Sequence, residues 1–140
     1  MNQNHFNVIV VGAGISGISA GYHLQKRCPN QTFAILESRD TIGGTWDLFR
    51  YPGIRSDSDM QTMGFRFKPW KGVKSIADGQ SILNYLDETV KENGLDKKIH
   101  FNRRVNEASW SSHDSKWTVR VENKKTQEIK DVTCEFLFLC

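Results

Sequence analysis

Three glycines near the start of the chain, together with one glutamate further on, have the spacing of a dinucleotide site. Gly12, Gly14 and Gly17 form the pattern G-x-G-x-x-G, and Glu37 lies 37 − 17 = 20 residues after the last of them. The first glycine permits a tight turn, the second lets backbone approach a pyrophosphate, and the third lets a helix pack close to a strand. Glu37 can accept hydrogen bonds from ribose hydroxyls, and its charge would repel a 2′-phosphate. We therefore expect a dinucleotide other than NADP at this site.

The residues around this pattern must supply a strand, a tight turn and a helix. Residues 6–11 form a β-branched apolar run that is typical of a strand buried on both faces. Apolar residues at helical spacing follow from Gly14 until Pro29, and residues 32–36 predict a second buried strand. We therefore expect a βαβ unit over residues 1–39, with a right-handed crossover.

The remaining residues predict one more helix and several short strands. Residues 40–77 show no sustained period, and a loop region of this length is usually functional. Residues 78–94 predict a helix with Asp78 as its N-cap. Residues 95–134 predict a small antiparallel β-meander with strands at 99–101, 104–110, 116–122 and 128–133, and residues 135–140 predict a returning strand buried on both faces. The expected fold class is α/β, a Rossmann-like domain with a parallel sheet and a meander over residues 1–140.

A second glycine pair, Gly43-Gly44, begins 43 − 37 = 6 residues after Glu37. A paired glycine after the ribose carboxylate is typical of flavin enzymes with this fold, because it lets the chain turn along the pyrophosphate. A dense run of charged and aromatic residues follows it: Thr45-Trp46, Arg50-Tyr51-Pro52-Gly53, Arg55, Asp57, Ser58-Asp59-Met60, Phe65, Phe67 and Pro69-Trp70. On these residues the sequence resembles the class B flavoprotein monooxygenases of the Baeyer–Villiger type, and within them the mycobacterial ethionamide-activating subgroup. The resemblance extends from Val8 to Cys140.

The resemblance implies FAD and NADPH as cofactors, and O2 and a small-molecule ketone or a sulfide- or thioamide-like compound as substrates. Such enzymes oxygenate their substrate through a C4a-peroxyflavin, and the flavin carries the chemistry. The resemblance implies that Arg55, Ser56 and Asp57 meet the nicotinamide of NADP, with Arg55 and Asp57 as supporting catalytic residues. Outside this context, the Arg55 and Asp57 pair would be interpreted as an ordinary loop ion pair. With the glycine pattern included, the residues expected to bind FAD are Gly12, Gly14, Ser16, Gly17, Glu37, Gly44, Thr45, Trp46, Asp47, Leu48, Asp57 and Val105.

Several features of the family have no counterpart in this sequence. We find no second G-x-G-x-x-G motif for NADPH, and the main catalytic arginine of the family would lie outside the chain. We therefore expect an amino-terminal piece of a protein three to four times as long, which lacks the NADPH domain and is inactive alone. The alternative is a stand-alone FAD- or nucleotide-binding module without catalytic activity. An NAD dehydrogenase or flavin reductase half is disfavoured by the Arg50-Tyr51-Pro52-Gly53 block.

Composition excludes several other classes of function. Nineteen basic and 16 acidic residues give a net charge of +3, and the basic residues are spread along the chain, so we expect no nucleic-acid partner. Three cysteines without a C-x-x-C pair and four scattered histidines predict no metal site and a reducing, cytoplasmic location. The uncharged stretch over residues 6–22 has no preceding basic residue and is interrupted by glycines, so we expect neither a signal peptide nor a membrane span. Peripheral membrane contact of a longer protein is left open.

Overall fold

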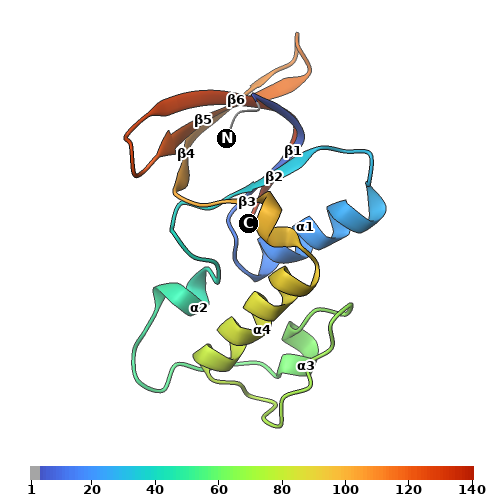
Figure 1. Ribbon diagram of the computed structural model, residues 1–140, viewed down its shortest axis with the longest axis vertical. Helices are drawn as coiled ribbons and strands as arrows, with labels where there is room; N and C mark the ends of the chain where they lie inside the picture. The colour runs from blue at the N-terminus through green and yellow to red at the C-terminus, as the bar shows by residue number, and fades with distance from the viewer. Residues whose placement is uncertain (1–3) are drawn as a thin grey trace.

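A six-stranded mixed sheet with helices packed against it dominates the computed structural model, which describes residues 4–140 (Figure 1). The chain begins with β1 (His5–Val11), α1 (Ile15–Arg27) and β2 (Phe33–Leu36). Strands β1 and β2 are parallel, with Val10 paired to Ile35, so the helix between them is a βαβ crossover. The predicted strand, helix and strand are therefore confirmed, and α1 ends at Arg27, two residues before Pro29.

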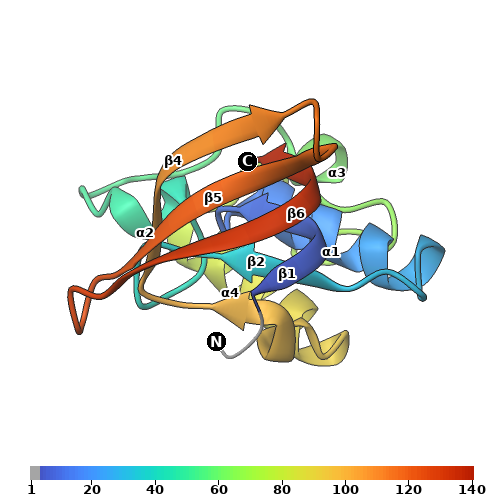
Figure 2. The same cartoon turned by 90° about the horizontal axis from the view of Figure 1, so that it is seen from above.

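The sheet combines a parallel half and an antiparallel half (Figure 2). Its strand order is β3-β2-β1-β6-β5-β4, in which the later strands are β3 (Ile99–His100), β4 (Arg103–Ser111), β5 (Lys116–Asn123) and β6 (Ile129–Leu139). Strands β3, β2, β1 and β6 run parallel, whereas β6, β5 and β4 are antiparallel neighbours. The predicted α/β class with a parallel sheet and a β-meander is confirmed, and both parts belong to one sheet.

Two predictions about the strands were wrong. Residues 128–133 and 135–140 were expected to form separate strands, but β6 is continuous because its first half pairs with β5 and its second half pairs with β1. Thr133 lies at the junction and pairs with Thr118 on one side and His5 on the other. Residues 99–101 were assigned to the meander, but β3 instead extends the parallel half by pairing with β2.

Residues 40–77 contain more regular structure than their sequence predicts. They include two single-turn helices, α2 (Thr45–Leu48) and α3 (Met60–Met63), which are too short to leave a periodic pattern. The next helix, α4 (Gly79–Glu92), begins as predicted at Asp78, whose carboxylate accepts a hydrogen bond from Ser81 N–H at 2.9 Å. Gly94 follows with φ of +62°, a conformation that favours glycine, and leads into the 3₁₀ turn η1 (Leu95–Lys98).

The core lies on both faces of the sheet. Helices α1 and α4 cover one face, where Ile18, Ile35 and Leu86 are fully buried. On the other face the meander curls over β1 and β2 and encloses Ile9 and Val132. In residues 4–140 no helix is both long enough and apolar enough to cross a membrane.

The end of β6 is less buried than its sequence predicts. Phe136 is 58% exposed and Phe138 is 44% exposed, although a continuous apolar run was expected to be buried on both faces. Both side chains line a shallow apolar groove beside α1. Phe136 pairs with Val8 of β1, so it lies on the face of the sheet that α1 covers, but α1 contacts β1 and β2 and leaves β6 open.

Candidate dinucleotide site

A cavity of about 630 Å³ lies where the carboxyl ends of β1, β2 and β6 meet. This edge of a parallel sheet is where α/β proteins bind their ligands. The volume falls within the ordinary range for small-molecule and cofactor sites, about 300–1,000 Å³. The cavity is lined by Val11, Gly12, Gly14, Ile15, Ser16, Leu36, Glu37, Ser38, Gly43, Gly44, Thr45, Trp46, Arg103, Arg104, Val105, Lys124 and Cys140.

The first wall is the turn between β1 and α1. Gly12 has φ of +101°, and its N–H donates to the Leu36 carbonyl oxygen at 2.8 Å, which holds the turn against β2. A Cβ on Gly17 would lie 1.9 Å from the Gly12 carbonyl oxygen, so only glycine lets α1 begin this close to the strand. The first N–H groups of α1 have no partner within the helix, and they sit at the positive end of its dipole. The turn can therefore bind an anionic phosphate.

The carboxylate of Glu37 is buried and held from two sides. Its Oε2 accepts a hydrogen bond from Ala13 N–H at 2.8 Å, which ties the end of β2 to the first glycine turn. Its Oε1 accepts from Arg39 N–H at 2.9 Å and from Ser38 Oγ at 3.3 Å. A carboxylate oxygen has two acceptor positions, and among residues 4–140 Oε2 uses only one of them. The other position suits a ribose hydroxyl.

The second wall is the turn that precedes α2. Gly43 and Gly44 have φ of +111° and +53°, and Gly43 N–H donates to the Ala13 carbonyl oxygen at 3.0 Å. A Cβ on Gly44 would lie 3.1 Å from the Cα of Gly14. The two glycine turns thus touch through backbone alone and form one continuous surface that a pyrophosphate could approach.

The structure brings together most of the predicted FAD residues but not all of them. The cavity is lined by Gly12, Gly14, Ser16, Glu37, Gly44, Thr45, Trp46 and Val105. Gly17 lies beneath the first turn and supports it. Leu48 is 60% exposed on α2, and it lies outside the residues that line the cavity, as does Asp47.

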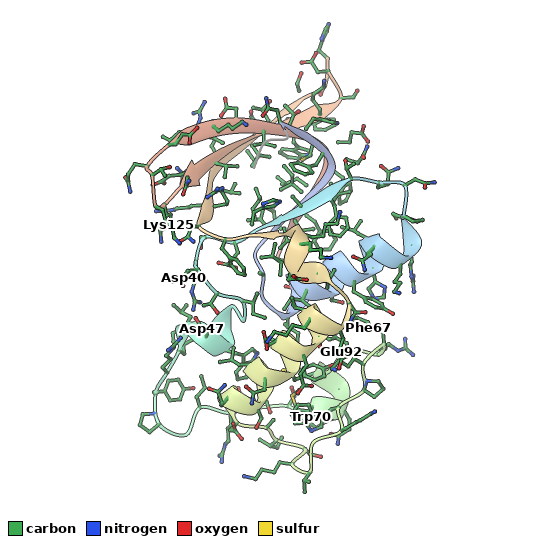
Figure 3. The ribbon with its side chains drawn as sticks, in the orientation of Figure 1. Asp40, Asp47, Phe67, Trp70, Glu92 and Lys125 are labelled. Carbon is green, nitrogen blue, oxygen red and sulfur yellow. The ribbon has the colours of Figure 1, made fainter. Side chains whose placement is uncertain are left out.

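The carboxylate of Asp47 is committed to two arginines. Figure 3 labels Asp47 on α2 and Asp40 on the loop that follows β2. Asp47 is buried, and its two oxygens form ion pairs with the guanidinium groups of Arg39 and Arg50. Arg39 also donates from Nη1 to the Gly44 carbonyl oxygen at 3.0 Å. The Asp47 carboxylate therefore binds two protein side chains and does not line the cavity.

The residues expected at the nicotinamide lie outside the set that lines this cavity. Arg55 forms an isolated antiparallel bridge with Asp78. Ser56 is buried, donates its N–H to the Ala77 carbonyl oxygen at 2.9 Å and accepts the Ala77 N–H on Oγ at 3.1 Å. Arg55 and Asp57 flank it and are both exposed, and no ion pair joins them within the described part of the chain.

Nine of the 17 residues that line the cavity were not predicted to bind FAD, and four of these nine lie beyond residue 100. Arg103, Arg104 and Lys124 are basic residues at the start of β4 and just after the end of β5, and they were interpreted only as scattered charges. Their neighbour Val105 was expected to bind FAD only because the family resemblance implied it. Cys140 lies beside the first glycine turn, where its N–H donates to the Val11 carbonyl oxygen at 3.0 Å. Burial raises the pKa of the Cys140 thiol, and a hydrogen bond with Ser16 partly opposes that rise.

This arrangement of two glycine turns, a buried ribose-type carboxylate and a parallel sheet edge defines a dinucleotide-binding domain of the Rossmann type. Residues 10–78 match the family model of the NAD(P)-binding Rossmann-like domain. The chain is 60% identical to the FAD-containing monooxygenase EthA of Mycolicibacterium smegmatis and 51% identical to the putative FAD-containing monooxygenase MymA of Mycobacterium tuberculosis. These matches cover 97% and 100% of this chain, but 27% and 28% of those proteins.

The fold matches solved structures of the same group. A structure described as an oxidized steroid monooxygenase bound to NADP superposes with a TM-score of 0.86 at 29% identity, over 99% of this chain and 26% of that one. Over its length the chain is therefore similar to FAD-containing monooxygenases, and the resemblance stated from the sequence is confirmed. The chain spans little more than a quarter of the length of these relatives.

Proposed function

We propose that this chain supplies the FAD-binding side of an NADPH- and O2-dependent flavin monooxygenase that oxygenates ketones or sulfur compounds. The observation that carries the proposal is the cavity in which two contacting glycine turns meet the Glu37 carboxylate. The names of the similar proteins support a flavin in that cavity, and the steroid monooxygenase bound to NADP supports NADPH as the second cofactor. The monooxygenase activity of the full-length protein and its action on a small-molecule substrate are part of the same proposal.

The residues present fit an FAD. Gly14 and Gly44 leave a surface without Cβ atoms for the pyrophosphate, and the N–H groups at the start of α1 face it. Glu37 keeps an acceptor position for a ribose hydroxyl, and Thr45 and Trp46 at the start of α2 line the same cavity and would contact the bound cofactor. Bound FAD supplies the redox chemistry, by accepting a hydride from NADPH and reacting in its reduced form with O2.

The segment with Arg55 and Asp57 is proposed to meet the nicotinamide. Its central residue, Ser56, is buried and fixed to Ala77 by backbone and hydroxyl hydrogen bonds. Arg55 and Asp57, on either side of this anchored residue, are both exposed to solvent. There the guanidinium can donate two parallel hydrogen bonds to an anionic or carbonyl oxygen, and the carboxylate can accept from an amide.

The direct test uses the protein as its gene encodes it. We expect the purified protein to keep a flavin absorbance spectrum after desalting, and to oxidise NADPH faster when cyclohexanone or methyl phenyl sulfide is added. Mass spectrometry of the products separates the two substrate classes, since a ketone yields an ester or lactone and a sulfide yields a sulfoxide. Protein that retains no flavin would contradict the proposal at its first step. Protein that retains FAD but oxygenates neither probe would instead favour the module without catalytic activity.

Two further parts of the proposal concern the short chain and its compartment. We expect the 140 residues alone, supplied with FAD, to show little or no substrate-dependent NADPH oxidation. A reducing, cytoplasmic compartment is supported by the three cysteines of the described chain, which are all free. Fractionation of cells that express the tagged protein tests the location.

A further inference from the structure

One buried ion pair connects the two halves of the dinucleotide cavity. Arg39 lies two residues after Glu37, and Asp47 lies on α2, three residues after the second glycine turn. The Asp47 side chain is 8% exposed and the Arg39 side chain is 26% exposed, so both charges are largely removed from water. A charged pair at this depth is costly unless its remaining hydrogen-bonding groups are satisfied.

The arginine satisfies that condition by contacting both the ribose-binding carboxylate and the second glycine turn. Its backbone N–H donates to Glu37 Oε1 at 2.9 Å, on the ribose side. Its guanidinium donates to the Gly44 carbonyl oxygen at 3.0 Å and pairs with Asp47, on the pyrophosphate side. Its carbonyl oxygen accepts from Asn102 N–H at 2.9 Å, next to the basic residues of the cavity rim.

The second glycine turn depends on this contact. Gly44 carries its carbonyl oxygen toward three donors, which are the N–H groups of Asp47 and Leu48 and the guanidinium of Arg39. The helical N–H groups belong to α2 itself and move with the turn. The guanidinium is the donor that comes from the loop after β2, so together with the link through Ala13, which accepts from Gly43 N–H and donates to Glu37, it holds the turn relative to the ribose carboxylate.

We propose that Arg39 and Asp47 are a positioning pair that fixes the distance between the ribose-binding carboxylate Glu37 and the second pyrophosphate-binding turn at Gly44. This inference rests on the proposed dinucleotide function and deepens it. Asp47 then acts on the cofactor through Arg39 and Gly44, without a contact of its own. The expected effect on affinity is selective. Loss of the pair should weaken ligands that contact both Glu37 and the second glycine turn, and should change little the affinity of ligands that contact Glu37 alone.

The experiment compares AMP, which carries the ribose and one phosphate, with ADP and FAD, which carry the whole pyrophosphate. Affinities are measured by calorimetry for the protein as its gene encodes it, after removal of any bound flavin, and melting temperatures are recorded in parallel. The variants are Arg39→Gln and Asp47→Asn, with Arg39→Lys as the conservative form. Arg50→Gln is the matched control, because Arg50 pairs with the same carboxylate but is 74% exposed and makes no hydrogen bond to Gly44 among the described residues.

We expect Arg39→Gln and Asp47→Asn to weaken ADP and FAD about tenfold or more, as loss of a charge-assisted hydrogen bond implies, while AMP changes less than about twofold. Arg39→Lys keeps one donor and should fall between these variants and the wild type. Arg50→Gln should match the wild type. Equal losses for AMP and ADP, in step with a lower melting temperature, would show a merely structural pair and overturn the inference, as would unchanged ADP affinity. A wild-type protein that binds neither ADP nor FAD would instead refute the proposed function itself.

Discussion

Two glycines of the first turn, three residues apart, should respond to alanine in opposite ways. Gly14 has φ of −78°, which alanine adopts freely, and a Cβ there would lie 3.6 Å from the Cα of Gly44, an ordinary contact. Gly17 lies in α1, and a Cβ there would lie 1.9 Å from the Gly12 carbonyl oxygen. The added methyl group therefore meets the cavity wall in Gly14→Ala and the protein backbone in Gly17→Ala.

The magnitudes follow from these distances. Cβ atoms essentially never approach another heavy atom within 3.0 Å, so Gly17→Ala requires the turn to move by 3.0 − 1.9 = 1.1 Å. Overpacking of this kind costs about 3 kcal/mol, which lowers the melting temperature by roughly 10 °C in a domain of this size. In Gly14→Ala the weaker N-cap, about 0.5–1 kcal/mol, is offset by the lower entropy of the unfolded chain, about 0.4–1 kcal/mol. Its melting temperature should stay within about 4 °C of the wild type.

FAD affinity, in contrast to stability, should be lowered by Gly14→Ala. The Gly14 methyl group occupies space between the two glycine turns, so FAD affinity should fall roughly five- to 150-fold, the equivalent of about 1–3 kcal/mol of overpacking against the ligand. Thermal melts followed by circular dichroism, and FAD titrations followed by flavin fluorescence, give the two quantities for each variant. A Gly14→Ala protein that melts as low as Gly17→Ala, or that binds FAD as tightly as the wild type, would refute this reading of the turn.

Three further predictions concern groups away from the cavity. Tyr85→Phe leaves the buried Phe65 N–H without its acceptor at 2.7 Å and should cost about 1–3 kcal/mol of unfolding free energy, measured by urea titration. Burial raises the pKa of the Cys134 thiol to about 11, so a thiol reagent at pH 8 should modify exposed Cys28 at once and Cys134 only after denaturation. Hydrogen bonds from Ser81 lower the pKa of Asp78 below 3.8, so its stabilisation of α4 is complete above that value and is lost as the pH falls below it. Acid melts of Asp78→Asn should lack this component of the pH dependence.

The sequence was most informative where one residue type can satisfy a local constraint. Gly12 and Gly17 are required by a positive φ and a backbone contact, and Asp78 by the unpaired N–H groups at the start of α4, so pattern alone located them. The sequence was least informative about which helix packs against a given face of a strand. The run that includes Phe136 and Phe138 is as apolar as β1, but burial on the second face requires a helix, and α1 packs over β1 and β2 instead. Periodicity carries no information about that choice.

The basic residues of the cavity, Arg103, Arg104 and Lys124, show where strand order alone would not have extended the prediction. Parallel strands β1, β2 and β6 place Gly12, Glu37 and Cys140 at one edge, because each follows the carboxyl end of its strand. Strand β5 is antiparallel to β6, and β4 is antiparallel to β5, so β4 runs in the same direction as β6 and strand direction alone would put its first residues at the end opposite Cys140.

Strand β6 is long, however, and its first part, residues 129–134, pairs with β5, whereas residues 133–139 pair with β1. The antiparallel half of the sheet is therefore shifted along β6 relative to the parallel half, and the sheet curls between them. Arg103 pairs with Asn123 at one end of the β4–β5 hairpin, and Lys124 N–H donates to the Asn102 carbonyl oxygen at 3.0 Å. That end is tied to the loop after β2, because Arg103 N–H donates to the Glu37 carbonyl oxygen at 2.8 Å. Arg103 and Lys124 are therefore held at the cavity by a backbone hydrogen bond to Glu37, the residue expected to bind the ribose. Both side chains line the cavity together with Glu37, where their positive charge would favour an anionic dinucleotide.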